Sequence, residues 1–407
     1  MRIGIVSETW PPEINGVALT VAGLARALAA GGHDVHVVRP RQAADATPVA
    51  DETGLTTTLV GGIGIPRYPG LQFGLPATRR LRRAWRAGRP DAIYVATEGP
   101  LGWSALRAAR ALGIPAASGF HTRFDEFARH YGFGILAKPV FAWLRRFHRM
   151  AAATFVPTIE LAEFLSARDF GNVVCMPRAV DTSLFDPARR DDTLRTLWGA
   201  GPRQLVVIHV GRIAPEKNLD LAVRSFRAIQ DAVPDARCVW VGDGPARAAL
   251  AAENPDFVFA GIRRGEELAR HYASADLFIF PSLTETFGNV TLEALASGVP
   301  TIAFDYGAAR EHVNADCGRV VPFGDAAAFV AAAGELAAKR DALRSMRPAA
   351  RAAVATLDPP AVTAQFARAL AQLGAPAPAA STAHSGPTQP KRQADADASN
   401  DPIRSAT

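Results

Sequence analysis

Two glutamates, Glu285 and Glu293, are separated by seven residues in the stretch PSLTETFGNVTLEALASGVP (281–300). Carboxylates accept hydrogen bonds from the hydroxyl groups of sugars and riboses, so this pair could bind two such rings. A helix of small residues is predicted over 290–297, which places Glu293 one turn into the helix and Glu285 before it. The alternative makes Glu285 a solvated loop residue and Glu293 a partner of the helix dipole.

The turn between the two glutamates has the composition of an anion site. Asn289 is predicted as the N-cap of the helix, and Gly298 lies just past its end. A helix N-terminus offers unpaired backbone N–H groups and a partial positive charge, and Gly288 lets a ligand come close to that backbone. We therefore predict that a diphosphate binds here, with one carboxylate on either side of it.

Two cations occur earlier, at another junction between a predicted strand and a predicted helix. In GRIAPEKNLDLAV, Arg212 ends the strand and Lys217 begins the helix. Together they can neutralise a diphosphate, above all when it departs with additional charge. Taken singly, either residue could be ordinary surface charge. Glycine-bearing turns follow the next two strands, VGDGP at 241–245 and GIRR at 261–264, and the second could hold a base edge through backbone groups.

Buried strands and helices alternate along the chain. This order would bring together the charged residues and glycines that follow the individual strands. Apolar runs rich in Ile and Val predict parallel strands, and the stretches between them predict helices. The strands predicted in the first half are RIGIVSE (2–8), DVHVVRP (34–40), DAIYVAT (91–97), PAASGFH (115–121), ATFVPT (153–158) and VVCMP (173–177), with helices over 17–32, 101–112 and 140–153.

The pattern restarts after a loop rich in Asp, Pro and Arg at about 181–203. The strands predicted in the second half are QLVVIHVG (204–211), ARCVWVG (236–242), DFVFAG (256–261), DLFIFPS (276–282) and VPTIAF (299–304), and helices alternate with them. The sequence therefore predicts an α/β protein with two successive doubly wound sheets. In such folds ligands bind beyond the carboxyl ends of the strands.

Four segments follow from this organisation. Residues 1–182 and 203–357 are predicted to form two Rossmann-like domains. A helix at 358–374 is expected to pack back on the first domain. The last segment, 375–407, is dominated by Ala, Pro, Ser, Thr and Asp, and is predicted to be a disordered tail.

Composition and charge narrow the class of protein. Hydrophobic residues make up 48% of the chain, yet no uncharged run approaches the length of a membrane-spanning helix. Residues 1–180 carry 21 Lys and Arg against 13 Asp and Glu, which indicates an anionic partner. No nucleic-acid-binding motif is present. Three separated cysteines and an early Glu8 argue against a disulfide framework and a signal peptide, so we expect a cytoplasmic protein.

The densest cationic run is RRLRRAWRAGR at 79–89. Its apolar residues, Leu81 and Trp85, stand one helical turn apart, so the favoured interpretation is a solvated helix face with a buried Leu–Trp pair. The alternative hypothesis is an interfacial helix that makes peripheral contact with an anionic membrane at the inner face of the cell membrane.

Several motifs in order resemble those of the retaining glycosyltransferase family 4. GRIAPEKN, VGDGP, FIFPSLTETFGNVTLEALASGVPTIA and GAAREHV are similar to the donor-binding half of that family, including its E-x7-E pattern. ETWPPEINGVALTVAGLARALAAGGHDVHVV and GFHTRFDEFARHYG resemble its N-terminal half. The resemblance covers about residues 1–373 and implies the GT-B fold, in which two Rossmann-like domains face each other across a cleft.

The resemblance also implies roles for individual residues. Arg212 and Lys217 would bind the diphosphate of a nucleotide-sugar donor and stabilise the leaving group. Glu285 would hold hydroxyls of the transferred sugar, and Glu293 would bind the nucleotide ribose. The other donor-binding positions are Gly16, Gly211, Gly242, Gly244, Ile262, Arg263, Phe287, Gly288, Asn289 and Val290.

His121 ends a predicted strand in the motif GFHTRF. A lone histidine is often structural, but the family motif implies contact with the transferred sugar. We do not expect it to act as a nucleophile. The resemblance implies a retaining enzyme with front-face transfer, in which no clear covalent intermediate forms. No metal or other cofactor is implied: the Asp-x-Asp at Asp395–Asp397 lies in the tail, and Arg and Lys can supply the counter-charge.

The sequence thus predicts a hexosyltransferase that acts on a lipid or glycan acceptor, with GDP-mannose favoured as the donor. A UDP-sugar donor and a non-catalytic nucleotide-sugar-binding protein of the same fold are the alternatives. The acceptor is expected to contact N-terminal loops near Glu13, Arg123, Asp125 and Arg129. No nucleic-acid partner is expected.

Overall fold

The computed structural model describes residues 1–13, 16–42, 45, 54–64, 72–121, 134–285 and 287–374, with the side chains of 134–137 excepted. Three of the residues expected near the acceptor, Arg123, Asp125 and Arg129, lie outside the described residues. The tail at 375–407, with Asp395–Asp397, lies outside them too. Residues 1–374 belong to one compact unit.

The first half of this unit contains a seven-stranded parallel sheet with the order β3-β2-β1-β6-β7-β8-β9. Its strands are β1 (Arg2–Val6), β2 (Asp34–Pro40), β3 (Leu55–Val60), β6 (Ala92–Val95), β7 (Ala116–Gly119), β8 (Ala153–Val156) and β9 (Val173–Cys175). The helices between them are α1 (Gly16–Ala30), α2 (Thr78–Ala87), α3 (Pro100–Leu112), α5 (Gly134–His148) and α6 (Ile159–Ser166). A small antiparallel pair, β4 (Gly62–Gly64) and β5 (Gln72–Gly74), stands apart from the sheet.

The second half contains a six-stranded parallel sheet with the order β12-β11-β10-β13-β14-β15. Its strands are β10 (Val206–Val210), β11 (Arg237–Val241), β12 (Val258–Gly261), β13 (Leu277–Phe280), β14 (Thr301–Phe304) and β15 (Gly318–Val321). Its helices are α8 (Leu219–Ala232), α9 (Arg247–Glu253), α10 (Gly265–Ser274), α11 (Asn289–Ala296), α12 (Gly307–His312), α13 (Ala326–Ala338) and α14 (Arg340–Ala353). The strand order reverses between β10 and β13, which makes the carboxyl ends of these two strands a topological switch point.

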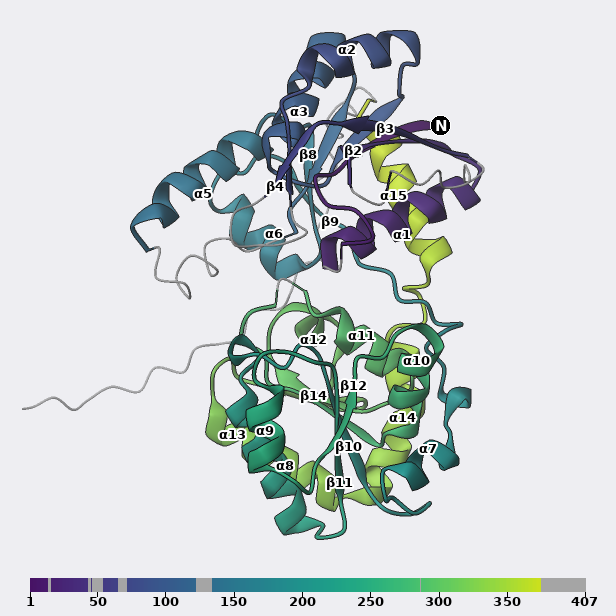
Figure 1. The fold of residues 1–407 in the computed structure, drawn as a ribbon, viewed down its shortest axis with the longest axis vertical. Helices are drawn as coiled ribbons and strands as arrows, with labels where there is room; N and C mark the ends of the chain where they lie inside the picture. The colour runs from purple at the N-terminus through teal and green to yellow at the C-terminus, as the bar shows by residue number, and fades with distance from the viewer. Residues whose placement is uncertain are drawn as a thin grey trace, which may run out of the picture. The chain divides into compact units, whose positions relative to one another are not determined.

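The last helix, α15 (Pro359–Gln372), returns to the first sheet and lies beside α1 (Figure 1). Asp358 caps it, since its carboxylate accepts a hydrogen bond of 2.7 Å from the amide of Ala361. Phe366 and Leu370 of this helix are buried in the same hydrophobic cluster as Ile3 and Ile5 of β1. Each apolar side chain buried in this way contributes about 1.5–3 kcal/mol to the free energy of folding.

Several local predictions were wrong. The helix predicted at 140–153 is α5, which ends at His148 because a hydrogen-bonded turn at 149–151 leads directly into β8. Asn289 is the first residue of α11 and not its N-cap, which is Gly288 with φ of 93°. Lys217 lies in a 3₁₀ turn, η3 (Pro215–Lys217), ahead of α8.

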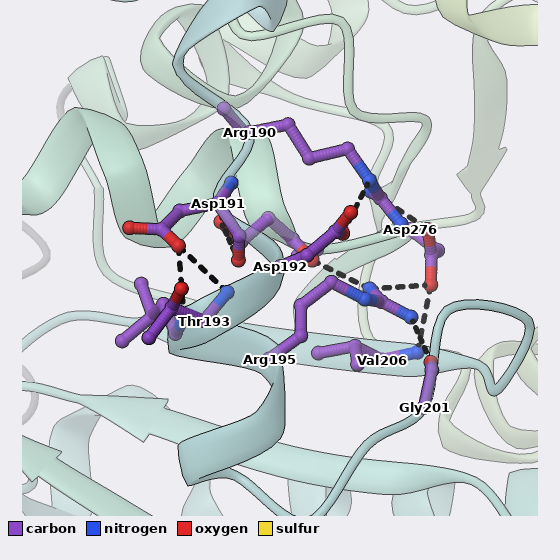
Figure 2. Close-up of polar contacts among 12 residues, drawn as sticks. Arg190, Asp191, Asp192, Thr193, Arg195, Gly201, Val206 and Asp276 are labelled. Atoms are coloured by element: carbon purple, nitrogen blue, oxygen red, sulfur yellow. Dashed lines mark hydrogen bonds and ion pairs between the residues drawn. The ribbon is translucent and has the colours of Figure 1, made fainter.

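The segment predicted as a loop at 181–203 is partly helical. It contains the 3₁₀ turn η2 (Pro187–Arg189) and the short helix α7 (Asp192–Leu197). Figure 2 shows how polar contacts fix this segment to the second sheet. Asp191 caps α7 through hydrogen bonds of 2.8 and 3.1 Å from the amides of Thr193 and Leu194.

The centre of these contacts is the carboxylate of Asp276. It lies 3.1 Å from Nη1 of Arg195, a side chain that is 1% exposed, and 3.2 Å from Nη1 of Arg190. It also accepts a hydrogen bond of 2.9 Å from the amide of Val206, at the start of β10. The Arg195 guanidinium donates further to the carbonyls of Ser274, Gly201 and Gln204. Buried Arg195 is therefore neutralised, and both of its Nη atoms donate hydrogen bonds, while its Nε has no partner among the described residues.

We predict that Asp276→Ala lowers the free energy of unfolding by about 3–5 kcal/mol, because it leaves Arg195 as a buried charge without a partner. Urea unfolding followed by circular dichroism measures this change. Asp341→Ala is the matched control, since Asp341 is 99% exposed in its ion pair with Arg344 and its loss should have no measurable effect. Equal stability of the two variants would contradict the role of Asp276.

Candidate active site

The switch point of the second sheet brings together two of the residues singled out in the sequence. The loop after β10 carries Lys217 and the loop after β13 carries Glu285, and Nζ of Lys217 forms an ion pair with Oε1 of Glu285. Each side chain is 19% exposed, so the pair is partly shielded from water. Ser282 donates a hydrogen bond of 3.0 Å to the same carboxylate oxygen.

Backbone-directed contacts hold these two loops against each other. The side-chain amide of Asn218, a residue with left-handed φ of 56°, donates to the carbonyl of Pro281 at 3.1 Å. The hydroxyl of Thr284 donates to the carbonyl of Glu216 at 3.2 Å. Tyr306, after β14, donates its hydroxyl to the carbonyl of Ser282 at 2.7 Å and accepts from the amide of Glu285 at 3.2 Å. The position of the ion pair is thus set by the backbone of both loops.

Arg212 shares the loop with Lys217 but its side chain is differently placed. It is 64% exposed, and its Nη1 lies 3.4 Å from Oε1 of Glu216. The structure therefore does not bring Arg212 into contact with Lys217 or Glu285.

The glycines of the neighbouring turns have a structural explanation. Gly242 has φ of 139°, and a Cβ atom there would lie 1.9 Å from the carbonyl oxygen of Gly211. A Cβ atom at Gly244 would lie 2.2 Å from the carbonyl oxygen of Ile213. The turn after β11 therefore packs backbone-to-backbone on the loop after β10, and glycine is required for that approach.

The N-terminus of α11 begins directly after the turn that carries Glu285. Gly288 occupies the N-cap position, so no side chain of the described residues caps this helix. Phe287 is 4% exposed, and its carbonyl accepts a hydrogen bond of 2.7 Å from the amide of Ala308. Asn289 is exposed. The first amides of α11 are therefore available to an anion.

Glu293 lies one turn further along α11, on the side that faces α10. The hydroxyl of Tyr272 donates to its Oε2 at 3.1 Å, and this hydroxyl is also 3.3 Å from the carbonyl of Val290. Burial raises the pKa of Glu293 from the ordinary value of 4.5 to about 7, although the Tyr272 hydrogen bond acts in the opposite direction. This carboxyl group therefore titrates near neutral pH.

His121 follows β7, and both of its ring nitrogens have partners. Nε2 lies 2.6 Å from the hydroxyl of Tyr94, and Nδ1 lies 3.0 Å from Nη2 of Arg178. Burial, and next the nearby charge of Arg178, lower the pKa of His121 well below its ordinary value. The sequence analysis missed both partners. The signal for Arg178 was its place three residues after the end of β9 in VVCMPRAV, at the carboxyl edge of the first sheet.

A pocket of about 310 Å³ joins His121 to the start of α11. Arg178, Tyr94 and Thr20 line its polar end, together with Asn289. Its apolar walls come from α1, α15 and the ends of the strands, and comprise Leu19, Gly23, Leu24, Ala27, Phe155, Val156, Pro157, Met176, Pro177, Ala179, Pro359, Val362 and Phe366. Gly16, at the first position of α1, is exposed, and its carbonyl accepts a hydrogen bond of 2.7 Å from Thr20.

The corresponding switch point of the first sheet, between β1 and β6, is filled by the chain itself. Oε1 of Glu8 accepts hydrogen bonds of 2.7 and 3.4 Å from the amides of Leu101 and Gly102, at the start of α3. Glu8 is 5% exposed, and burial raises its pKa from 4.5 to about 7. A carboxylate of the protein thus occupies the position where this helix could have bound an external anion.

The turn after β12 begins at Gly261, whose carbonyl accepts a hydrogen bond of 2.9 Å from the amide of Gly242. Ile262 is 59% exposed. The side chain of Arg263 lines a different pocket, formed with α7 and α10 residues such as Trp198 and His271. Only backbone groups of this turn therefore remain as candidates for contact with a ligand of the main site.

Within the described residues, no group of three or more His, Cys, Asp and Glu side chains could hold a metal ion. The described helices also include none that is both long and apolar enough to cross a membrane.

Comparison with known proteins identifies the family. Residues 14–184 match the domain described as "Glycosyltransferase Family 4", and residues 204–339 match the domain described as "Glycosyl transferases group 1". The chain is 37% identical over 331 residues to a GDP-mannose-dependent alpha-mannosyltransferase of Mycobacterium tuberculosis, covering 80% of this chain and 85% of the relative. The chain belongs to the family 4 glycosyltransferases.

A second relative of this glycosyltransferase has the same description. It is a GDP-mannose-dependent alpha-mannosyltransferase of Mycolicibacterium smegmatis, 37% identical over 316 residues, covering 77% of this chain and 82% of the relative. The family assignment confirms the resemblance seen in the sequence. It also settles the choice between an enzyme and a non-catalytic binding protein in favour of a glycosyltransferase.

Solved structures confirm the GT-B fold of this glycosyltransferase. Sucrose-phosphate synthase from Thermosynechococcus elongatus superposes with a TM-score of 0.73 at 20% identity, covering 91% of this chain and 98% of that one. HepE of Anabaena, solved in complex with UDP, superposes with a TM-score of 0.72 at 18% identity, covering 91% and 100%. At these identities the likeness shows the fold alone.

From the ribose contact expected for Glu293, we predict that the affinity for GDP falls as the pH drops below about 7, the pKa of Glu293. Protonation removes the charge that strengthens a hydrogen bond from a ribose hydroxyl, so affinity should fall by up to tenfold per pH unit. Calorimetric titration between pH 5.5 and 8 measures this effect.

Glu293→Gln is the control, because GDP also titrates in this range and only the difference between the proteins reports Glu293. Ionisation of the Glu293 carboxyl group also affects the stability of the folded protein. The folded protein holds its proton to a higher pH than the unfolded chain, so ionisation between pH 4.5 and about 7 lowers stability, and Glu293→Gln should remove this loss. Parallel GDP profiles for both proteins would contradict contact with the ribose.

Proposed function

We propose that this glycosyltransferase transfers mannose from GDP-mannose to a hydroxyl of a lipid or glycan acceptor, with retention of configuration. The observation that carries the proposal is the 37% identity over most of the chain to two GDP-mannose-dependent alpha-mannosyltransferases. The Lys217–Glu285 pair at the switch point of the second sheet supports it, because both charges stand where a nucleotide-sugar would bind.

Lys217 and Arg212 are the residues proposed to bind the diphosphate. In the free protein the charge of Lys217 is matched by Glu285, so a bound diphosphate would share the ammonium group with that carboxylate and fix its position. Arg212 would move from Glu216 to the diphosphate. This movement costs little, since an exposed pair of that kind contributes about 0.2–1 kcal/mol. The two cations would then stabilise the leaving group as its charge develops.

The proposed roles at the two sugar rings belong to the two glutamates. Glu285 would accept hydrogen bonds from hydroxyls of mannose, with the backbone of Phe287, Gly288, Asn289 and Val290 at the start of α11 facing the phosphates. Glu293 would accept from the ribose. Its place one turn deeper in the helix would put it on the nucleotide side of that helix terminus.

The remaining residues would shape the site. Gly211, Gly242 and Gly244 would let the loops after β10 and β11 stack closely enough to leave room for the donor. The backbone at Ile262 and Arg263 would contact the edge of the base. From the first half of the chain, His121 would contact mannose and Gly16 would approach the phosphates. We also propose that the two domains comprise residues 1–182 and 203–357, and that the helix at 358–374 belongs with the first.

We predict that Lys217→Ala lowers kcat for mannose transfer by about 10²–10³-fold, as expected for the loss of one group that stabilises developing charge. Release of GDP from GDP-mannose, with and without an added acceptor extract, measures the rate. The exposed Lys339→Ala is the matched control and should retain full activity. The wild-type protein should also be stabilised in a thermal melt by GDP more than by UDP. Greater stabilisation by UDP, with turnover of a UDP-sugar, would overturn the proposed donor.

We also propose peripheral contact with anionic membrane through 79–89. In α2, Leu81 and Trp85 are 0% and 1% exposed and pack with α3, so they are not available for insertion into a bilayer. The arginines that face solvent are Arg79, Arg80, Arg83, Arg86 and Arg89. Any membrane contact of this helix is therefore electrostatic.

We predict that the protein sediments with vesicles containing anionic lipid at low salt and is released at about 0.5 M salt, where charges are screened beyond a few ångströms. Replacement of Arg79, Arg80, Arg83 and Arg86 by Gln should abolish this binding without loss of fold. Negligible sedimentation with both anionic and neutral vesicles would end the hypothesis.

A further inference from the structure

Arg178 connects three separate parts of the site, and no role has been given to it above. It follows β9, the last strand of the first sheet. Its Nη1 donates to the hydroxyl of Thr20 in α1 at 2.7 Å, and its Nη2 donates to Nδ1 of His121 at 3.0 Å. Its Cζ lies 5.8 Å from the ring centre of Phe287, in the turn before α11. The guanidinium also lines the pocket of about 310 Å³.

The partners of Arg178 differ from those of two other arginines of the chain, Arg195 and Arg351. Arg195 is paired with Asp276, and Arg351 is paired with Asp186 at 3.0 Å and donates to three backbone carbonyls as well. The partners of Arg178 among the described residues are a hydroxyl, an imidazole and an aromatic face, with no carboxylate or carbonyl. Burial lowers the pKa of Arg178. Within the described residues, its positive charge therefore has no carboxylate partner, and it lies beside the proposed donor site.

The contact with His121 determines which ring nitrogen carries the proton. A guanidinium has only donors, so Nδ1 of His121 must accept, and the proton of the neutral ring is on Nε2. Nε2 then donates to the hydroxyl oxygen of Tyr94 at 2.6 Å. A neutral ring agrees with the lowered pKa of His121. Neither nitrogen has a free lone pair, so His121 is oriented as a contact surface and not as a base or nucleophile.

The contact with Thr20 extends this arrangement to the start of α1. The Thr20 hydroxyl accepts from Arg178 and donates to the carbonyl of Gly16 at 2.7 Å. One guanidinium thus fixes the placement of Gly16, His121 and Phe287, which are three of the proposed donor-site positions.

We propose that Arg178 is a positioning residue for sugar transfer, which holds His121 as the neutral Nε2–H tautomer and reserves a positive charge for the anionic donor. The inference rests on the proposed function for the identity of the donor. The tautomer itself is independent of that function, because it follows from the contacts of the free protein.

The first test is ¹⁵N NMR of the histidine side chains in the wild-type protein, with His121 assigned by the loss of its signals in His121→Gln. We expect the shifts of a neutral ring protonated at Nε2, unchanged from pH 6 to 8. Arg178→Met should give a mixture of both tautomers. A wild-type ring protonated at Nδ1, or one that becomes charged near pH 6.5, would overturn the proposal.

The second test is donor kinetics. Arg178→Met should lower kcat by about 10²-fold, the size of effect expected when a mutation misplaces the substrate by about 1 Å, and should raise KM for the donor. Arg178→Lys keeps the charge but lacks the planar fork that reaches both Thr20 and His121. We therefore expect Lys to restore KM and to leave kcat low. The exposed Arg224→Met is the matched control and should change neither.

Thr20→Val is the second variant in case Arg178→Met does not fold, because it removes one partner of Arg178 and leaves the charge. We expect His121 to keep its tautomer in this variant, with a smaller loss of kcat. Wild-type kcat and KM in both Arg178 variants would overturn the positioning role even if the tautomer is as expected. If GDP-mannose is not a substrate but the NMR result holds, the proposed donor fails and the assignment of the tautomer stands.

Discussion

The ion pair between Lys217 and Glu285 is the interaction on which the site depends. It joins the loops that follow β10 and β13, the two strands between which the order of the second sheet reverses. Neighbouring parallel strands diverge at this point, so their loops part and leave space beyond the sheet. The pair closes the base of that space with opposite charges whose side chains are each 19% exposed. A cation and a hydrogen-bond acceptor are thus held together beyond the ends of these two strands.

Hydrogen bonds to the backbone hold the two loops that carry Lys217 and Glu285. Asn218, Thr284 and Tyr306 all bind backbone carbonyls of the two loops, so the loops are held whether or not the charged side chains are present. Below them, Asp276 ties α7 to the start of β10 and β13 through Arg195 and Val206 (Figure 2). The side chains that hold the loops are thus different from the charged pair that is proposed to bind the ligand. A site of this kind can lose Lys217 or Glu285 without losing its framework.

Much of the fold could be predicted from the sequence, because each buried parallel strand is a short run of Ile, Val and similar residues. β2 was predicted to the residue, and α1, α3 and α15 were predicted within one or two residues of their bounds. The strands β3 and β15 were missed. β3 is an LTTTLV stretch at the edge of the sheet, and β15 begins with Gly318 and Arg319, so neither has an apolar run. The 181–203 segment was missed for another reason: Asp and Arg there form tertiary ion pairs, which composition alone does not reveal.

The same limit explains which site residues sequence reasoning could find. Lys217 and Glu285 follow predicted strands and belong to a recognisable spacing, so their proximity was expected. Tyr94 lies in β6 and Arg178 follows β9, far away in the chain, so their meeting at His121 depends on tertiary packing. For Arg212, by contrast, the sequence identifies the residue but not the position of its side chain. Its place in the motif is clear, but a long exposed side chain has no unique position until a ligand provides one.

The carboxylate of Glu8 has a consequence for the chain as a whole. Two folds of the same kind stand in one polypeptide, and each has a helix whose first amides point beyond the sheet. In the first fold, the side chain of Glu8 occupies the N-terminus of α3. Gly99 leaves room for this side chain, since a Cβ atom at Gly99 would lie 1.9 Å from Oε2 of Glu8. The two α/β folds therefore differ at their switch points: a carboxylate of the chain binds the first amides of α3, whereas no side chain of the described residues caps α11.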